Sequence, residues 1–195
     1  MRLPRLTPEQ YSSVQRELAE RIGGKRGKVA GPFTCWLHSP GLCDRIESLA
    51  TYVRFESALS EKLRELCLLI TARYWGAQDS WNAHTDKAKA AGLPVEVISA
   101  VADNRPPPFI SKDEAALYDF SKELLETGFV SDATFSVAVG VFGTQGVVDL
   151  VGCLGTFTMM AMCLNAFQVD LDPAKAPPFA DLSGYTRLTP RKPLG

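Results

Sequence analysis

Apolar residues recur at helical spacing along most of this 195-residue chain, and no segment alternates polar and apolar residues over the length of a strand. In one such stretch, Leu42, Ile46 and Val53 fall on the same face of a helix. An apolar face of this kind is stable only when other helices cover it. The pattern predicts an all-α protein in which about seven to eight helices share a core.

Helix-start and helix-stop signals place the helices along the chain. A capping box at Thr7 predicts a first helix that stops at the glycine pair beginning with Gly23. Gly76 predicts a break between two central helices, and Gly92 predicts the end of the second. The expected helices cover residues 7–22, 39–53, 60–75, 80–91, 94–102, 111–127, 131–142 and 146–167.

Two segments outside the helical body differ in composition. The run from Gly23 to Lys28 is basic and glycine-rich, but it lacks the Gly-Lys-Ser/Thr ending of a phosphate-binding loop, so we expect a flexible, solvated linker. The end of the chain is rich in proline and polar residues. We therefore expect an N-terminal helix and linker at 1–29, a helical domain at 30–170 and an extended C-terminal tail at 171–195.

The overall charge gives no reason to expect a polyanionic partner. A net charge of −1 indicates neither a nucleic-acid surface nor a membrane surface. The charge-free stretch from Leu150 to Leu164 is shorter than the roughly 20 residues that cross a membrane, so it predicts a buried helix or an oligomer interface. The N-terminal residues contain no apolar core of signal-peptide length. We expect a cytoplasmic protein.

The five cysteines show no paired spacing. They are Cys35, Cys43, Cys67, Cys153 and Cys163. An odd number of cysteines without a Cys-x-x-Cys pair predicts neither a disulfide framework nor a zinc site. We expect buried, reduced thiols and no bound metal.

Glu65 and His84 are the residues best suited to chemistry. Glu65 lies among leucines, where an inward-facing carboxylate must be paired, hydrogen-bonded or neutral. His84 lies one helical turn beyond Ser80 and three residues after Trp81. An imidazole with a carboxylate within reach is typical of an acid/base site at neutral pH, and a structural histidine is the alternative.

The segment from Arg64 to about Ala102 resembles the carboxymuconolactone decarboxylase family, which includes the alkylhydroperoxidase D proteins. The matching motifs are an apolar helix that contains Glu65, then Trp-Gly-Ala-Gln, Trp-x-x-His-x-x-x-Ala and Ala-Gly-Leu. Weaker likeness extends over residues 30–170. The resemblance implies an alkylhydroperoxidase D-like helical bundle that forms a homo-oligomer, either a trimer, a dimer or a hexamer.

The alkylhydroperoxidase branch carries the pattern Glu-x11-Cys-x2-Cys-x3-His. Glu65 and His84 match its Glu and His, whereas Ala77 and Ser80 occupy the two cysteine positions. A thiol peroxidase needs one thiolate to attack the peroxide and a second to resolve the sulfenic acid. A thiol-dependent, peroxidase-like antioxidant protein is therefore a disfavoured alternative.

The decarboxylase branch works by acid/base chemistry without a metal or organic cofactor. The resemblance thus implies a cofactor-independent, lyase-like enzyme that acts on a small carboxylated lactone or related oxygenated ring compound, as in aromatic compound degradation. His84 would donate or shuttle a proton, and Glu65 would orient the imidazole or a water. The expected substrate-binding residues are Gln78, Ser80, Trp81, Tyr74, Trp75 and His38. A non-catalytic helical oligomer that binds a small molecule is the further alternative.

Overall fold

The structure of the protein is a computed structural model that describes residues 1–109 and 111–180. Within these residues it contains eight α-helices, one 3-10 turn and no strand, which confirms the all-α fold class. Residues 181–195 of the predicted tail lie outside the described residues. The elements are η1 (Pro8–Gln10), α1 (Ser13–Arg26), α2 (Phe33–Trp36), α3 (Pro40–Phe55), α4 (Glu61–Trp75), α5 (Gln78–Ala90), α6 (Val95–Ala102), α7 (Lys112–Thr127) and α8 (Asp132–Phe167).

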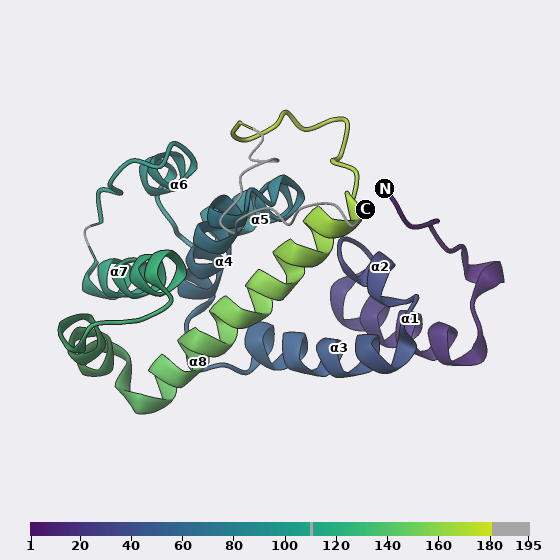
Figure 1. Ribbon diagram of the computed structural model, residues 1–195, viewed down its shortest axis with the longest axis horizontal. Helices are drawn as coiled ribbons and strands as arrows, with labels where there is room; N and C mark the ends of the chain where they lie inside the picture. The colour runs from purple at the N-terminus through teal and green to yellow at the C-terminus, as the bar shows by residue number, and fades with distance from the viewer. Residues whose placement is uncertain (110, 181–195) are drawn as a thin grey trace, which may run out of the picture.

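Helix α4 is the central helix of the bundle, and α5, α7 and α8 pack around it (Figure 1). Leu66, Cys67 and Leu69 of α4 are completely buried, although they point in different directions around the helix. A helix that is apolar nearly all round needs neighbours on every side. The packing of these four helices therefore creates the larger of the two hydrophobic cores.

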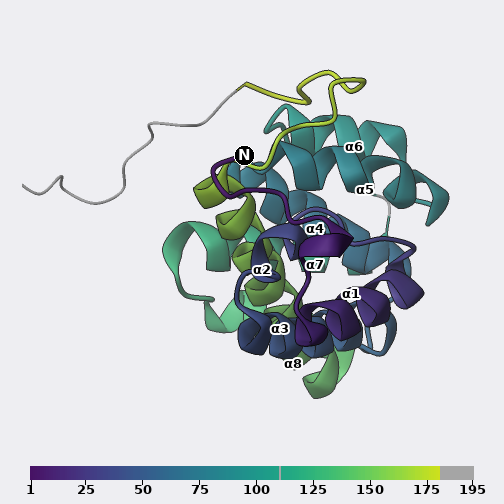
Figure 2. The ribbon, with the colours of Figure 1, turned by 90° about the vertical axis from the view of Figure 1, so that its right-hand side faces the viewer.

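Helices α1, α2 and α3 lie together at one end of the molecule and form a second, smaller core (Figure 2). The buried carboxylate of Glu47 on α3 binds basic side chains of α1. Its oxygens lie 3.0 Å from Arg21 Nε and 3.7 Å from Lys25 Nζ, and the Thr51 hydroxyl donates to it at 2.8 Å. These contacts fix the position of the C-terminal half of α1.

The first helix begins and ends later than the sequence predicts. Thr7 precedes only the short turn η1, and α1 begins after Ser12, whose hydroxyl accepts the N3 backbone N–H. The helix then continues through Gly23 and ends at Gly27, where φ is 81°. Glycine inside a helix costs about 1 kcal/mol relative to alanine, but the contacts of α1 with α3 hold the helix together. The basic run is thus helical from Gly23 to Arg26 and is not the expected solvated linker.

The predicted break at Gly76 is present, and it sets the geometry of the site. Gly76 adopts the left-handed conformation (φ 64°, ψ 26°) that glycine tolerates best, and it ends α4. Helix α5 begins two residues later and packs back along α4. With a rise of about 1.5 Å per residue, Glu65 and His84 lie about 16 Å and 12 Å from the turn. The hairpin therefore brings the two side chains to nearly the same level.

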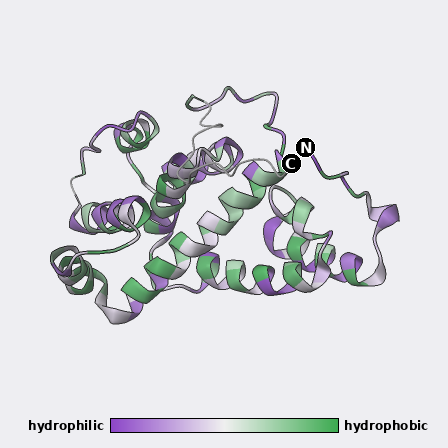
Figure 3. Cartoon of the chain, viewed as in Figure 1, coloured by the Kyte–Doolittle hydropathy of each residue, from purple (hydrophilic) through white to green (hydrophobic). Residues whose placement is uncertain are grey.

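Helix α8 is kinked at Gly143 (φ 68°, ψ 174°), where the two helices predicted at 131–142 and 146–167 meet. It is apolar over most of its length (Figure 3). By length and composition alone it could cross a membrane, but 56% of its most apolar window is buried inside the protein. The core helix of a soluble protein has the same properties. Val148 and Met162 remain exposed, and an oligomer interface on this side of α8 stays a prediction.

Asp149 attaches α8 to α3 and to the connection between α3 and α4. Its carboxylate is 7% exposed and accepts hydrogen bonds from the Tyr52 hydroxyl at 3.0 Å and from the Ala58 backbone N–H at 2.7 Å. A buried carboxylate is tolerated when such donors satisfy it. These two bonds therefore fix how α8 lies against the start of the central hairpin.

Asp149→Ala is expected to lower the free energy of unfolding by about 2 kcal/mol, because a buried N–H and a hydroxyl lose their charged acceptor. Urea denaturation followed by circular dichroism measures the change. Val148→Ala, at an exposed neighbour on the same helix, is the matched control and should change stability by less than about 0.5 kcal/mol. Equal stabilities of the Asp149 variant and the wild type would contradict this role.

Candidate active site

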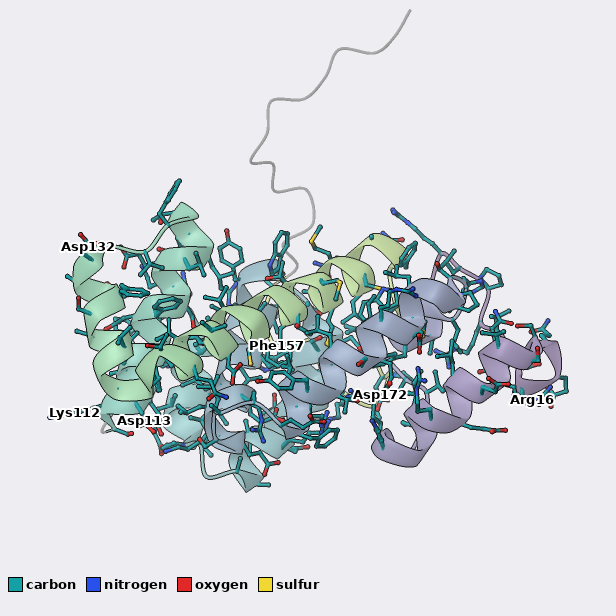
Figure 4. All side chains as sticks on the ribbon, turned by 90° about the horizontal axis from the view of Figure 1, so that it is seen from below. Arg16, Lys112, Asp113, Asp132, Phe157 and Asp172 are labelled. Atoms are coloured by element: carbon teal, nitrogen blue, oxygen red, sulfur yellow. The ribbon has the colours of Figure 1, made fainter. Side chains whose placement is uncertain are left out.

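A cavity of about 840 Å³ lies between α1, α3, α4, α5 and the segment that follows α8. Phe157 on α8 and Asp172 after it are two of the residues that line it, and both are labelled in Figure 4. Ligand pockets commonly have volumes of roughly 300–1,000 Å³. The cavity is therefore large enough for a small organic molecule.

The Glu65–His84 pair lines this cavity. Glu65 Oε2 lies 2.7 Å from His84 Nδ1, and the side chains are 8% and 15% exposed. Because a carboxylate accepts and does not donate, Nδ1 carries the hydrogen and Nε2 is left as the basic nitrogen. Nε2 has no hydrogen-bond partner among the described residues. The pair thus presents an oriented imidazole with one free nitrogen.

Burial is the main influence on the charge of His84. It lowers the pKa of the imidazole below its usual 6.5, and the hydrogen bond and charge of Glu65 oppose this effect. The positive charges of Lys87 and Arg54 lower the pKa of His84 further. The imidazole is therefore neutral at pH 7 in the unliganded protein, ready to accept a proton.

One face of α5 forms a wall of the cavity. Ser80, His84 and Lys87 follow one another at four and three residues, the spacing that places side chains on one helix face, and all three line the cavity. Ala77 is 1% exposed and belongs to the hydrophobic core instead. Ala77 and Ser80 occupy the two positions that carry cysteine in the redox pattern. Ser80 therefore faces the cavity, and Ala77 does not.

The other residues expected to bind substrate lie outside the cavity wall. Trp81 is buried in the core, and Trp75 Nε1 donates to Thr158 at 3.2 Å. Tyr74 packs edge-on against Trp75. Gln78 Nε2 donates to the carbonyl of Phe179 at 2.9 Å, and the exposed His38 is bonded to Pro4 O at 3.0 Å. Packing in the core and hydrogen bonds with residues distant in the sequence account for the contacts of these side chains.

The described part of the expected tail covers one side of the site. Phe179 packs edge-on against Trp81, with ring centroids 5.5 Å apart. Lys175 Nζ donates to the Asn82 carbonyl at 2.7 Å, and Asn82 donates to Ala176 O at 3.3 Å. Residues 171–180 thus lie across the start of α5 and contribute to the cavity.

The predicted site residues included none of the basic residues that line the cavity, among them Arg26, Arg54 and Lys87. Lys87 could have been found, because it lies three residues after His84 on the same helix. Arg26 belongs to the run that was expected to be a linker. Its position depends on contacts between α1 and α3, which are far apart in sequence from α5.

The cysteines are all buried, as expected, and none lines the cavity. Burial raises the pKa of the Cys43 thiol to about 11, that of Cys153 to about 11 and that of Cys163 to about 12. Burial also raises the pKa of Cys67 well above its usual value. Within the described residues, no group of three or more His, Cys, Asp or Glu side chains has the arrangement of a metal site.

The sequence profile of the carboxymuconolactone decarboxylase family matches residues 40–117. This range contains the whole of α3, α4, α5 and α6, and with them both members of the Glu65–His84 pair. Among curated proteins, none matches the chain significantly.

Several solved structures share the fold. An uncharacterised peroxidase-related protein from Silicibacter sp. TM1040 has a TM-score of 0.73 at 15% identity, covering 89% of this chain and 91% of that one. A peroxidase-related protein with an alkylhydroperoxidase D core from Ralstonia eutropha JMP134 has a TM-score of 0.73 at 17% identity, covering 88% and 92%. The debrominase Bmp8, in a cysteine-to-alanine variant bound to 2,3,4-tribromopyrrole, has a TM-score of 0.71 at 10% identity, covering 87% and 91%. Residues 40–117 therefore match the carboxymuconolactone decarboxylase family, and the chain shares the alkylhydroperoxidase D-like fold of these structures.

Proposed function

We propose that this protein is a cofactor-independent acid/base enzyme in which the Glu65–His84 pair moves a proton on a small ring compound. The observation that carries the proposal is the 2.7 Å hydrogen bond between two largely buried side chains at the wall of a large cavity. The bond fixes the tautomer and orientation of the imidazole. A positioned imidazole of this kind contributes about 100-fold to 10,000-fold to proton transfer.

A carboxylated lactone is the substrate class that fits best. Loss of carbon dioxide breaks the bond to the carboxylate carbon and leaves its electron pair delocalised toward the lactone carbonyl. The imidazolium of His84 delivers a proton to the ring carbon, returns to the neutral form and takes up the next proton from water. Ser80, on the same face of α5, can donate a hydrogen bond to the carbonyl oxygen on which negative charge develops.

The resting charge of His84 suits this cycle. The imidazole is neutral in the unliganded protein because burial and neighbouring cations lower its pKa. An anionic substrate beside it offsets the positive charges of Arg54 and Lys87 and favours the imidazolium. Proton uptake is thereby coupled to the arrival of a negatively charged substrate, and a neutral molecule would not produce it.

Two features disfavour thiol chemistry in this site. The residues of the cavity wall include Ser80 and no cysteine, and serine cannot form the sulfenic acid that a thiol peroxidase requires. The raised pKa values of the buried thiols also keep them protonated. The cysteine-to-alanine variant of the debrominase Bmp8 provides an example of this fold bound to a small heteroaromatic ring.

His84→Gln and His84→Ala are each expected to reduce the release of carbon dioxide from 4-carboxymuconolactone at least about 100-fold, because neither side chain can shuttle a proton. Glu65→Gln should reduce it by about tenfold or more, because the imidazole loses its charged partner. Turnover is measured from the loss of lactone together with carbon dioxide release. Circular dichroism verifies that each variant is folded.

His38→Gln is the matched control, since it changes the other histidine of the chain, which is exposed and lies outside the cavity. It should retain wild-type turnover. Full activity in both His84 variants would refute the assignment of the proton shuttle. A folded wild-type protein that releases no carbon dioxide from the lactone would refute the decarboxylase proposal.

The titration of His84 provides an independent prediction. Its pKa should lie below 6.5 in the wild type and fall further in Glu65→Gln, because Glu65 raises it through a hydrogen bond and its charge. The unfolded chain takes up a proton on this residue before the folded protein does. His84 therefore lowers stability as the pH falls from 6.5 toward its folded pKa, and has no such effect above that range.

Nitrogen-15 chemical shifts of the two histidine rings, recorded against pH, measure both the pKa and the tautomer of His84. The spectrum should show a protonated Nδ1 and an unprotonated Nε2 at pH 7. A His84 pKa above 6.5, or a proton on Nε2 at that pH, would contradict the geometry assigned to the pair.

A further inference from the structure

The cavity wall is positively charged, although the whole chain carries a net charge of −1. Among the described residues, the wall includes seven basic and four acidic side chains. The basic residues are Lys25, Arg26, Lys28, Arg54, Arg64, Lys87 and Lys175, and the acidic residues are Glu61, Glu65, Asp79 and Asp172. Such a surface attracts anions from solution.

Arg26 and Arg54 lie together on one side of this wall. The guanidinium of Arg26 lies 5.0 Å from the ring centroid of Phe33 and 5.9 Å from that of Phe55. The guanidinium of Arg54 lies 5.5 Å from the centroid of the same Phe55 ring. The two rings hold the guanidinium groups in place without neutralising their charge.

The hydrogen-bonding groups of Arg26 are incompletely satisfied. Its Nε and Nη2 are buried and have no partner among residues 1–109 and 111–180. Donors of this kind lose their bonds to water and gain nothing in return. Burial and then the charge of Arg54 lower the pKa of Arg26, and the charge of Glu47 opposes them only in part.

Lys87 connects these two arginines with His84. Burial lowers the pKa of its ammonium, and the charges of Arg54 and Arg26 lower it further. The positive charge of Arg54 also lowers the pKa of His84. Arg54 thus lowers the pKa values of Arg26, Lys87 and the imidazole. In the described part of the chain, none of the three basic side chains has an ion-pair partner.

The acidic groups of the cavity do not neutralise this cluster. Glu65 is bonded to His84. Asp79 is partly buried, which raises the pKa of its carboxyl. On the segment after α8, the charge of Asp172 raises this pKa further and that of Lys175 lowers it. Glu47 and Glu65 act on Arg26 and Lys87 only through their charge, and among the described residues no acidic group forms an ion pair with Arg26, Arg54 or Lys87.

We propose that Arg26, Arg54 and Lys87 form a carboxylate-binding subsite that holds the ring substrate against the Glu65–His84 pair. Each guanidinium presents a planar set of donors that matches the two oxygens of a carboxylate, and Lys87 adds a point charge on the side of His84. This inference extends the proposed function, on which it rests for the identity of the ligand as a substrate. Binding at the subsite, however, requires no turnover.

The test compares 2-furoate, an oxygenated ring with one carboxylate, with 2-furamide, its neutral counterpart. Both are titrated into the full-length protein, and backbone amide and arginine Nε–H chemical shifts are followed by NMR. The wild type should bind 2-furoate at least about tenfold more tightly than 2-furamide, because only the carboxylate forms charge-assisted hydrogen bonds. Arg26→Gln and Arg54→Gln should each weaken 2-furoate binding about tenfold and leave 2-furamide binding unchanged.

Arg16→Gln is the matched control, since Arg16 is exposed on α1 and lies apart from the cavity residues Phe157 and Asp172 in Figure 4. It should bind 2-furoate as the wild type does. Arg26→Lys preserves the charge and tests whether the planar group is needed, and Arg54→Gln tests the subsite if the Arg26 variants do not fold. Wild-type affinity in folded Arg26→Gln and Arg54→Gln would overturn the proposal, as would equal binding of the two furan compounds.

Two further outcomes separate the subsite from the reaction. Tighter binding of inorganic phosphate than of 2-furoate at Arg26 would overturn the choice of a carboxylate. Arginine-dependent binding of 2-furoate without carbon dioxide release from 4-carboxymuconolactone would support the subsite and refute the decarboxylase proposal. Carbon dioxide release that is unaffected by Arg26→Gln and Arg54→Gln would support the decarboxylase proposal and refute the subsite.

Discussion

The hydrogen bond between Glu65 and His84 depends on a short turn, and the site depends on that bond. Gly76 ends α4 in a left-handed conformation, so α5 packs back along α4 and the two side chains meet at 2.7 Å. Because α4 is surrounded by α5, α7 and α8, the hairpin has little freedom to open. The same packing buries Glu65, and a buried carboxylate needs a donor such as His84. The turn at Gly76 and the packing of the hairpin therefore determine the position of the imidazole, its tautomer and its proposed reactivity.

Opposing charges act on this imidazole. Burial and the cations Arg54 and Lys87 lower the pKa of His84, whereas Glu65 raises it. A bound anion would reduce the effect of the cations and leave that of Glu65 intact, so protonation of His84 and occupancy of the cavity favour each other. In the proposed mechanism, this coupling would allow a histidine that is neutral in the free protein to act as an acid on a bound substrate. In the proposed subsite, Arg54 would thus influence the charge of His84 as well as attract the ligand.

Features that depend on neighbouring residues in the chain could be predicted from the sequence. Gly76 is such a local signal, and the break that it predicts between the two central helices is present. Arg26 was missed because the preceding glycines favour a helix end, while ion pairs of α1 with Glu47 extend the helix. Gln78 was expected in the cavity, but it bonds to Phe179, about a hundred residues further along the chain. Contacts over such distances in sequence have no local signature.

The two positions that carry cysteine in the alkylhydroperoxidase pattern have different environments in this protein. Ala77 is 1% exposed and packs in the core, whereas Ser80 lines the cavity beside His84. A reactive thiol at position 77 would need the core to open before it could meet a substrate, and an alanine fills that position without such a requirement. A hydroxyl at position 80 retains hydrogen-bonding capacity but cannot exchange electrons with a peroxide. The helical frame around Glu65 and His84 therefore suits the proposed transfer of protons, and the basic side chains that face the cavity suit the proposed anionic ring.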